Sequence, residues 1–432
     1  MNTKNWVEWF RQASPYINAH RHQELVLALS GEALKHSNLD NIIHDITLLN
    51  SLGVRQVLVF GARPQIDEAL NKNSIQSSFH KALRVTEDRM MPYVLEAYGR
   101  LRSELEAKLS MGLINSPMHG AKIKVVSGNF IMAKPHGVSS GVDMGLTGQV
   151  RKIDQATIEQ HLSNNSIVVI PAVGYSMTGD IFNLSYEELA GEVAAKLQAD
   201  KIIFFGHDNG LKDPSGELVS QLNATQALAY TAAEDQDVKN QLLASARACQ
   251  AGVERAHLLS YAHDGALLEE LFTRDGVGTM VSVDNYDQIR AARLEDMNGI
   301  LELIQPLEEQ GFLVRRSREL LETELDYFLV DVRDNAIIAC AGLYPFPANQ
   351  AGELSCFAVD QAYRRKGRGD RLLEAIIARA KNQNFSQLFV LTTKTEQWFK
   401  ERGFESANAQ ELPGNKNYNT DRNAKILVKR LD

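Results

Sequence analysis

The chain has 432 residues, a formal net charge of -8 and three cysteines. This length exceeds that of one ordinary domain and predicts two or three domains. The negative charge argues against nucleic acid or an anionic membrane as the main partner, because both attract lysine and arginine. No apolar run approaches the roughly 20 residues that a membrane span needs. The cysteines are odd in number and lack metal-ligand spacing, so we expect reduced thiols, no metal and a cytoplasmic location.

The first two-thirds of the sequence alternate short apolar runs with amphipathic segments of helical period. Such runs, separated by helices, indicate parallel βαβ units. We therefore predict an α/β fold over residues 1–280, with a mainly parallel sheet between two helical layers. Ligands of such sheets bind beyond the carboxyl ends of the strands. The predicted strands are Leu25–Leu29, Val57–Phe60, Lys122–Val126, Ile167–Ile170 and Lys201–Phe205.

The pattern changes after a glycine-rich stretch, and we place a linker at residues 281–288. Residues 289–432 fit one α+β domain. Its predicted helices are Asp296–Gln305 and Ser317–Thr323, and its predicted strands are Tyr327–Val332, Ala336–Ala341, Glu353–Val359, Leu388–Thr392 and Lys425–Lys429.

The strongest chemical signal is a basic, glycine-containing turn between the strand Glu353–Val359 and a predicted helix at Asp370–Lys381. Gly367 and Gly369 allow backbone N–H groups to approach a ligand, and the helix N-terminus adds partial positive charge. These features predict a pyrophosphate site, although an exposed basic turn that binds nothing is the simpler alternative. The cations that would reinforce the site are Arg364, Arg365, Lys366 and Arg368.

The pattern Arg364-x-x-Gly367-x-Gly369 resembles the CoA-binding motif, Q/R-x-x-G-x-G/A, of the GCN5-related N-acetyltransferase (GNAT) family. The segment Trp398–Phe404 resembles the closing helix and Gly-Phe turn of that family. A tyrosine that often protonates the leaving thiolate in this helix is missing here. The resemblance implies acetyl-CoA as a cosubstrate, and the identity of the general acid stays open.

The first two-thirds resemble the amino-acid kinase family, and the domain order resembles bacterial N-acetylglutamate synthases. The lysine of the kinase K-x-G-G strand is replaced by Ala28, the Gly-Gly-Gly-Pro turn is Gly61–Pro64, and the kinase aspartate is replaced by Glu187. Phosphoryl transfer depends on cations and backbone donors, so these departures favour a regulatory domain. The alternatives are an amino-acid kinase of the acetylglutamate kinase type and a non-catalytic arginine sensor.

The resemblance implies direct acetyl transfer from acetyl-CoA to the α-amine of L-glutamate, the first step of arginine biosynthesis. An ammonium group cannot attack a thioester, so a base must remove its proton, and Glu353 is the implied base. Arginine suits planar carboxylates, and Arg315 and Arg318 compete with Arg316 for that role. The implied glutamate site comprises Leu313, Arg316, Cys356, Thr392 and Arg422, with Thr392 also catalytic. The implied CoA contacts are Cys356, Phe357, Val359 and the turn from Arg364 to Gly369.

The resemblance also implies inhibition by L-arginine bound to the kinase-like domain, and a homo-oligomer, with a hexamer favoured. Glu270 could pair with a guanidinium, and Lys196 could meet a carboxylate. From the residues alone, Glu270 is instead an exposed helical partner of Arg274. The implied arginine site comprises Tyr16, Lys196, Leu268, Glu270, Arg274, Gly276 and Gly278.

Overall fold

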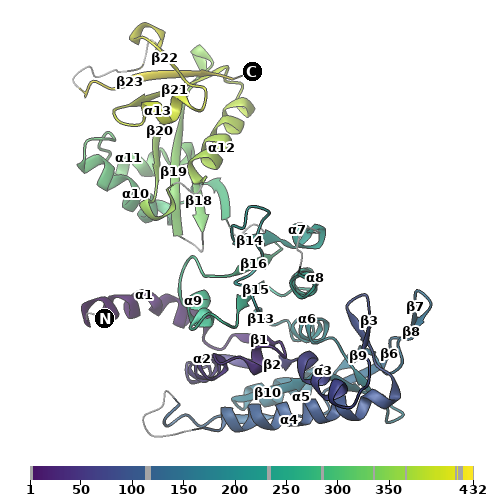
Figure 1. Cartoon of the computed structure of the whole chain (residues 1–432). Helices are drawn as coiled ribbons and strands as arrows, with labels where there is room; N and C mark the ends of the chain where they lie inside the picture. Colours follow the sequence, from purple (N-terminus) through teal and green to yellow (C-terminus); the bar gives the residue numbers. More distant parts are fainter. Residues whose placement is uncertain are drawn as a thin grey trace. The chain divides into compact units, whose positions relative to one another are not determined.

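The computed structural model describes residues 3–111, 118–230, 235–283, 287–333, 336–364, 367–413, 416 and 422–431. The chain divides into two compact units, Met1–Asn285 and Tyr286–Asp432, whose elements are labelled in Figure 1. Each unit has a hydrophobic core of its own. Among the described residues, no helix is both long and apolar enough to cross a membrane.

An eight-stranded sheet forms the centre of the first unit, and all neighbouring strands are parallel except β15 and β16. The central strands are buried along almost their whole length, as expected for a sheet covered on both faces. The strands in sheet order are β14 (Gln221–Asn223), β16 (Thr279–Ser282), β15 (Arg255–Ser260), β13 (Lys201–Gly206), β1 (Glu24–Leu29), β2 (Arg55–Phe60), β10 (Ser166–Pro171) and β5 (Lys124–Val126).

Helices connect these strands, and their buried residues recur at helical spacing. In α2, for example, Ile42, Ile43, Ile46 and Leu49 are buried in the core of the first unit. The helices are α1 (Thr3–His20), α2 (Leu39–Ser51), α3 (Arg63–Lys72), α4 (Met91–Leu109), α5 (Gln155–Ser163), α6 (Tyr186–Leu197), α7 (Ala224–Ala229), α8 (Gln236–Gln250) and α9 (Ala266–Phe272).

A second, four-stranded sheet and two short hairpins were not predicted from the sequence. The sheet order is β12-β11-β6-β9, and the hairpins are β3–β4 and β7–β8. These strands are short and carry little alternation of apolar and polar residues. Their bounds are β3 (Ser78–His80), β4 (Leu83–Val85), β6 (Ile131–Pro135), β7 (Val138–Ser139), β8 (Val142–Asp143), β9 (Gly148–Ile153), β11 (Val173–Tyr175) and β12 (Ile181–Asn183).

The second unit is built on a seven-stranded sheet in which only β20 and β21 are parallel neighbours. The strands in sheet order are β17 (Asp287–Ala291), β18 (Phe328–Arg333), β19 (Ala336–Phe346), β20 (Ala351–Val359), β21 (Gln387–Thr392), β23 (Lys425–Arg430) and β22 (Glu405–Ser406). The helices are α10 (Met297–Glu309), α11 (Arg318–Thr323), α12 (Arg368–Asn382) and α13 (Glu396–Lys400). Both ends of the linker predicted at 281–288 belong to strands. Val281 and Ser282 of β16 still pair with β15, and Asp287 and Gln288 of β17 already pair with β18.

The two long helices of the second unit pack on opposite faces of the sheet. Ala339 and Ala341 of β19 lie in one cluster with residues of α12, whereas Cys340 lies in another with residues of α10. Successive side chains of a strand point to opposite faces, so this alternation separates an α12 face from an α10 face.

Candidate active site

Strands β20 and β21 part in the middle of the second sheet. The two strands pair from Ala351 opposite Gln387 to Leu354 opposite Val390. Strand β20 then continues to Val359 without pairing with β21. Beyond Leu354, β20 therefore has only β19 as a neighbour among the described strands. A strand edge with unpaired backbone groups is suited to bind an extended amide-bearing ligand by strand addition.

A bulge in β20 sets the direction of the side chains at this opening. The pairing with β19 shifts between Cys340 and Gly342, and Cys356 has a positive φ of 50°. Leu354 lies in the α12 cluster before the bulge, and Cys356 lies in the α10 cluster after it. The extra residue therefore places Ser355 and Cys356 on the same, α10 face of the sheet.

The N-terminus of α12 follows β20 and carries the two glycines of the predicted motif. Gly367 precedes the helix with a φ of 71°, a conformation that L side chains rarely adopt. A Cβ atom at Gly369 would lie 3.0 Å from Cζ2 of Trp398, so this helix start passes close to α13. The first N–H groups of α12 and its dipole favour an anion here.

Two of the predicted cations of this turn contact other parts of the protein. Arg368 is buried, and its Nη1 lies 3.5 Å from Oδ2 of Asp331. Nε of Arg364 donates to the carbonyl of Val359 at 3.2 Å. Arg365 and Lys366 lie outside the described residues.

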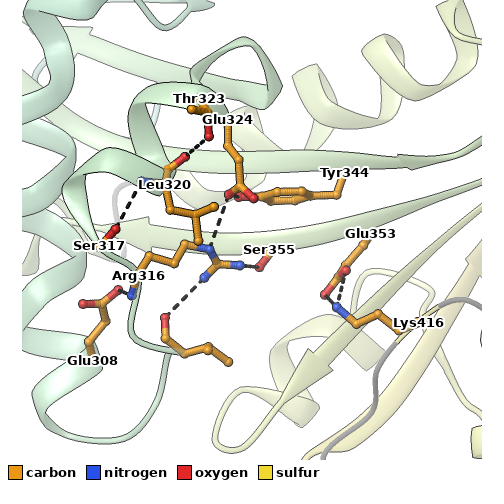
Figure 2. Close-up of polar contacts among 11 residues, drawn as sticks. Glu308, Arg316, Ser317, Leu320, Thr323, Glu324, Tyr344, Glu353, Ser355 and Lys416 are labelled. Atoms are coloured by element: carbon orange, nitrogen blue, oxygen red, sulfur yellow. Dashed lines mark hydrogen bonds and ion pairs between the residues drawn. The ribbon is translucent and has the colours of Figure 1, made fainter.

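Glu353 lies on β20 just before the opening, where it pairs in register with Tyr344 of β19 and Phe389 of β21. Its side chain is buried, and Nζ of Lys416 donates to both carboxylate oxygens at 2.6 and 2.5 Å (Figure 2). The ammonium group balances the charge of the buried carboxylate. Lys416 is 63 residues away in sequence and was not predicted.

Arg316 follows α10 and reaches the same α10 face of the sheet. Its Nη2 donates to Oγ of Ser355 at 3.0 Å, and Nε lies 3.8 Å from Oε2 of Glu324 (Figure 2). Ser355 is two residues from Glu353 on the same strand, so Arg316 is hydrogen-bonded to a residue on the same face of the sheet as Glu353. The Arg316 side chain is 15% exposed, which leaves it open to a ligand.

Three loops meet beside this face. Nη2 of Arg422 donates to the carbonyl of Gly311 at 2.8 Å, and Nζ of Lys394 lies 4.2 Å from the centre of the Phe312 ring. The backbone N–H of Leu313 donates to Leu307 and thereby ends α10. A cleft of about 480 Å³ lies beside Arg316, lined by Gln305, Glu308, Glu309, Arg315, Arg316 and Ser317.

Thr392 ends β21 and is buried. Its Oγ1 accepts backbone N–H groups of Lys394 at 3.3 Å and Thr395 at 3.0 Å, and lies 2.8 Å from Oγ1 of Thr395. These contacts stabilise the turn that leads into α13. The hydroxyl therefore has a structural role at the far side of the opening from β20.

The thiol of Cys356 is unsuited to nucleophilic attack. The side chain is 1% exposed, and burial raises its pKa to about 11, although the charge of Arg316 partly opposes this rise. A nucleophilic cysteine must be a thiolate at the working pH. This thiol is therefore protonated at neutral pH.

Aromatic side chains fill the place of the missing tyrosine. The ring of Phe357 lies 5.3 Å from that of Trp398 and 5.9 Å from that of Phe399. These rings carry no phenol. The phenol near Glu353 is instead that of Tyr344, whose pKa is raised by burial and by its hydrogen bond to Glu324.

Glu270, Gly276 and Gly278 of the predicted arginine site lie together after the start of α9. Glu270 is buried, and it accepts from Nδ1 of His257 at 2.6 Å and from the backbone N–H groups of Val277 at 2.6 Å and Gly278 at 3.0 Å. Burial raises the pKa of Glu270, but these contacts outweigh it and hold the pKa below its usual value. The side chain of Glu270 is therefore not exposed, and its carboxylate already has partners within the protein. A Cβ atom at Gly276 would clash with its Oε2.

Leu268 lies on the same helix as Glu270, and the other residues of that site lie on α1, on α6 and after α9. Tyr16 is on α1 and packs against the core, as does Leu268 on α9. Lys196 is exposed in the last turn of α6, and Arg274 is exposed after α9.

The kinase-like features of the first unit do not form a phosphate cradle. Ala28 is fully buried within β1, where it offers no cation. A Cβ atom at Gly61 would lie 2.7 Å from Cδ1 of Tyr186, so this side chain covers the glycine turn. Glu187 is buried 3.6 Å from Nη2 of Arg63, and burial raises its pKa. In the described part of the chain, no group of histidine, cysteine or carboxylate side chains could hold a metal ion.

Two family models match the chain, one in each unit. The Amino acid kinase family matches residues 23–260, and the Acetyltransferase (GNAT) family matches residues 297–404. These matches confirm the predicted fold class and the order of the two folds along the chain.

Curated relatives and solved structures match nearly the whole chain. The "Amino-acid acetyltransferase" of Azotobacter vinelandii is 49% identical over 431 residues, which cover 99% of this chain and 100% of that protein. The protein of the same name from Pseudomonas putida is 49% identical over 430 residues, with 99% and 100% covered.

Two structures of N-acetylglutamate synthase from Neisseria gonorrhoeae are 36% identical to the chain. The complex with coenzyme A and L-arginine has a TM-score of 0.86 and covers 98% of this chain and 99% of its own. The complex with coenzyme A and N-acetyl-glutamate has a TM-score of 0.64 and covers 99% of both chains. The chain therefore belongs to the amino-acid acetyltransferase family, as an N-acetyltransferase in which an amino acid kinase fold precedes a GNAT fold.

Proposed function

We propose that the chain is an N-acetylglutamate synthase that transfers acetyl from acetyl-CoA to the α-amine of L-glutamate. One observation carries this proposal: Glu353 and the guanidinium of Arg316 share one face of the sheet, next to the point where β20 and β21 part. A base and a carboxylate-binding cation at a strand opening are the groups that acetylation of an acidic amino acid requires.

Acetyl-CoA binds along the free edge of β20 in this proposal. Backbone groups of Phe357 and Val359 pair with the pantetheine arm, and the N-terminus of α12 at Gly367 and Gly369 receives the pyrophosphate. The complexes of the Neisseria gonorrhoeae relative with coenzyme A support this assignment. Arg364 and Arg368 have partners within the protein, so the backbone N–H groups at the start of α12 are the main donors to the anion in this proposal.

The acetyl group passes directly to the amine. Lys416 must first release a carboxylate oxygen of Glu353, because it binds both. Glu353 then takes the proton of the α-ammonium group, the nitrogen lone pair attacks the thioester carbonyl, and a new C–N bond forms. The C–S bond then breaks, the nitrogen gives up its second proton to the sulfur, and CoA leaves as the thiol. The buried, protonated thiol of Cys356 speaks against an acetyl-cysteine intermediate.

Two arginines bind the carboxylates of glutamate in this proposal. Arg316 approaches from the loop after α10, and Arg422 from the loop before β23, where it is joined to Gly311. Leu313 and Cys356 belong to the α10 cluster beneath this site, and Thr392 shapes the turn on the β21 side.

L-Arginine acts as a feedback inhibitor on the first unit, in line with the L-arginine complex of the relative. Its guanidinium would have to compete with His257 for Glu270, since both oxygens of that carboxylate already have partners. The resemblance of the sequence also supports a cytoplasmic homo-oligomer, with a hexamer favoured.

The test is the identity of the product. The purified chain is incubated with acetyl-CoA labelled with ¹³C in the acetyl group and with L-glutamate, and the amino acid is recovered for mass spectrometry. We expect N-acetyl-L-glutamate carrying the label. Binding of acetyl-CoA without labelled product would contradict the assigned acceptor, and a panel of other amino acids would then identify the amine that is acetylated.

A further inference from the structure

Arg316 is held by a carboxylate and a phenol to which the proposed reaction gives no role. The hydroxyl of Tyr344 donates to Oε2 of Glu324 at 2.6 Å, and Nε of Arg316 lies 3.8 Å from the same oxygen (Figure 2). The guanidinium carbon also lies 5.5 Å from the centre of the Tyr344 ring. One oxygen of Glu324 thus joins a strand side chain to the arginine.

The two partners come from different elements. Glu324 follows α11, and Tyr344 lies on β19 directly opposite Glu353. The ring of Tyr327 packs 5.1 Å from that of Tyr344. The side chains of Arg316 and Glu324 are 15% and 23% exposed, so their charges are only partly screened by water.

The remaining contacts fix the other side of the guanidinium. Nη2 donates to Oγ of Ser355 at 3.0 Å, and Nη1 donates to the carbonyl of Val314 at 3.3 Å. Each of these nitrogens carries two N–H groups, so each contact uses one of a pair. The arginine is therefore oriented before any ligand arrives, which lowers the entropy lost when a carboxylate binds.

We propose that Glu324 and Tyr344 are positioning residues that hold Arg316 for a carboxylate of the acceptor. This inference rests on the proposed function, in which Arg316 binds glutamate. A second effect of Glu324 has the opposite sign, because its negative charge weakens the attraction of Arg316 for an anion. Positioning predicts that loss of the carboxylate weakens glutamate binding, whereas a purely electrostatic effect predicts tighter binding.

The experiment measures KM for L-glutamate, KM for acetyl-CoA and kcat in Glu324→Gln and Tyr344→Phe. Glutamine keeps the shape of the side chain and removes its charge. We expect KM for L-glutamate to rise about tenfold in Glu324→Gln, which removes the charge that faces Arg316. We expect a rise of about threefold in Tyr344→Phe, which removes only the hydrogen bond that holds Glu324. We expect kcat and KM for acetyl-CoA to stay within about twofold, because these contacts orient the acceptor rather than the thioester.

Two control variants match these changes. Glu322→Gln removes a carboxylate of α11 that lies 3.1 Å from Nε of exposed Arg318. Tyr327→Phe removes the hydroxyl of the ring that packs against Tyr344. Both controls should keep the wild-type KM for L-glutamate. Similar melting temperatures would show that all four variants are folded.

A double-mutant cycle with Arg316→Ala separates positioning from other effects. If Glu324 acts through Arg316, then Glu324→Gln has no further effect on KM in the Arg316→Ala background. An equal rise in both backgrounds, or a lower KM in Glu324→Gln, would overturn the inference.

A crystal structure of Glu324→Gln gives a readout without turnover. We expect the guanidinium of Arg316 to leave Ser355, and an unmoved guanidinium would overturn the inference. A wild-type chain that does not acetylate glutamate would instead contradict the proposed function, and the crystal structure would still decide whether Glu324 holds Arg316.

Discussion

Two arginines near the start of α11 look equivalent in the sequence but have different surroundings. Arg318 is exposed and pairs with Glu322 one helical turn away. Arg316 is largely buried and bonded to Ser355 on the α10 face of the sheet. An exposed ion pair such as Arg318–Glu322 contributes little to the stability of the fold. A guanidinium that is held in place beside a cleft, as in Arg316, can bind the carboxylate of a ligand.

We expect Arg316→Ala to raise KM for L-glutamate by roughly 10- to 100-fold, the size of a lost hydrogen-bonded charge contact. KM for acetyl-CoA should stay near the wild-type value. The measurement is steady-state kinetics with each substrate varied in turn, and Arg318→Ala is the matched control. A loss of acetyl-CoA affinity without a change for glutamate would remove Arg316 from the glutamate site.

Cys356 supplies a second prediction at this scale. Because its buried thiol has a raised pKa, Cys356→Ala should keep kcat within about threefold of the wild type. Intact-mass spectrometry of the wild-type chain with acetyl-CoA alone should show no added acetyl group. A covalently acetylated chain, or a loss of activity of more than about 100-fold, would mean that the acetyl group passes through the protein.

The sequence alone indicated Glu353 and Arg316, because both lie in segments that resemble known motifs. Nothing in the sequence pointed to Glu324, Tyr344 or Lys416. The hydrogen bond of Tyr344 to Glu324 joins positions 20 residues apart, and that of Lys416 to Glu353 joins positions 63 residues apart. Such contacts depend on how the strands pair. The bulge reverses the alternation of side chains, so a strict period of two would assign Ser355 and Cys356 to opposite faces.

At the scale of elements, apolar periodicity was a good guide to the long strands and helices. The predicted helix Asp370–Lys381 corresponds to α12 (Arg368–Asn382), and the predicted strand Glu353–Val359 corresponds to β20 (Ala351–Val359). Short strands such as β12 carry too few residues to show a period, so the four-stranded sheet was missed.

The turn after α9 is the element whose geometry bears on arginine inhibition. Gly276 has a φ of 62°, and a Cβ atom there would clash with Oε2 of Glu270. We expect Gly276→Ala to displace this turn and to raise the arginine concentration for half-inhibition at least about tenfold. Inhibition curves at fixed L-glutamate give the measurement.

Gly179→Ala is the control for this change, because Gly179 also has a positive φ, of 92°, but a Cβ atom added there would meet no other atom within 4 Å. Gly179→Ala should leave the arginine concentration for half-inhibition at the wild-type value. An unchanged curve in Gly276→Ala would exclude this turn from the arginine site.

At the scale of the whole molecule, each unit departs from its family in a different way. The kinase-like unit keeps the fold but has Ala28 where a cation is needed and Tyr186 over its glycine turn. The acetyltransferase unit has a strand opening and a helix N-terminus. The proposed function therefore assigns the chemistry to the second unit, with Glu353 as the base, and regulation to the first.

This division predicts that purified chain does not turn over ATP with L-glutamate or N-acetyl-L-glutamate. The reason is the absence of a phosphate-binding cation at Ala28. Release of ADP is the measurement, and ADP release that depends on either amino acid would restore the kinase alternative.

The proposed reaction depends most on Glu353, the base that lets the amine of L-glutamate accept acetyl from acetyl-CoA. The most direct measurement is release of the CoA thiol by wild type and Glu353→Gln, with and without L-glutamate. We predict release that depends on glutamate in the wild type and falls about 100-fold or more in Glu353→Gln, the usual contribution of a general base. Wild-type release that does not depend on glutamate, or an equally active Glu353→Gln, would contradict this role.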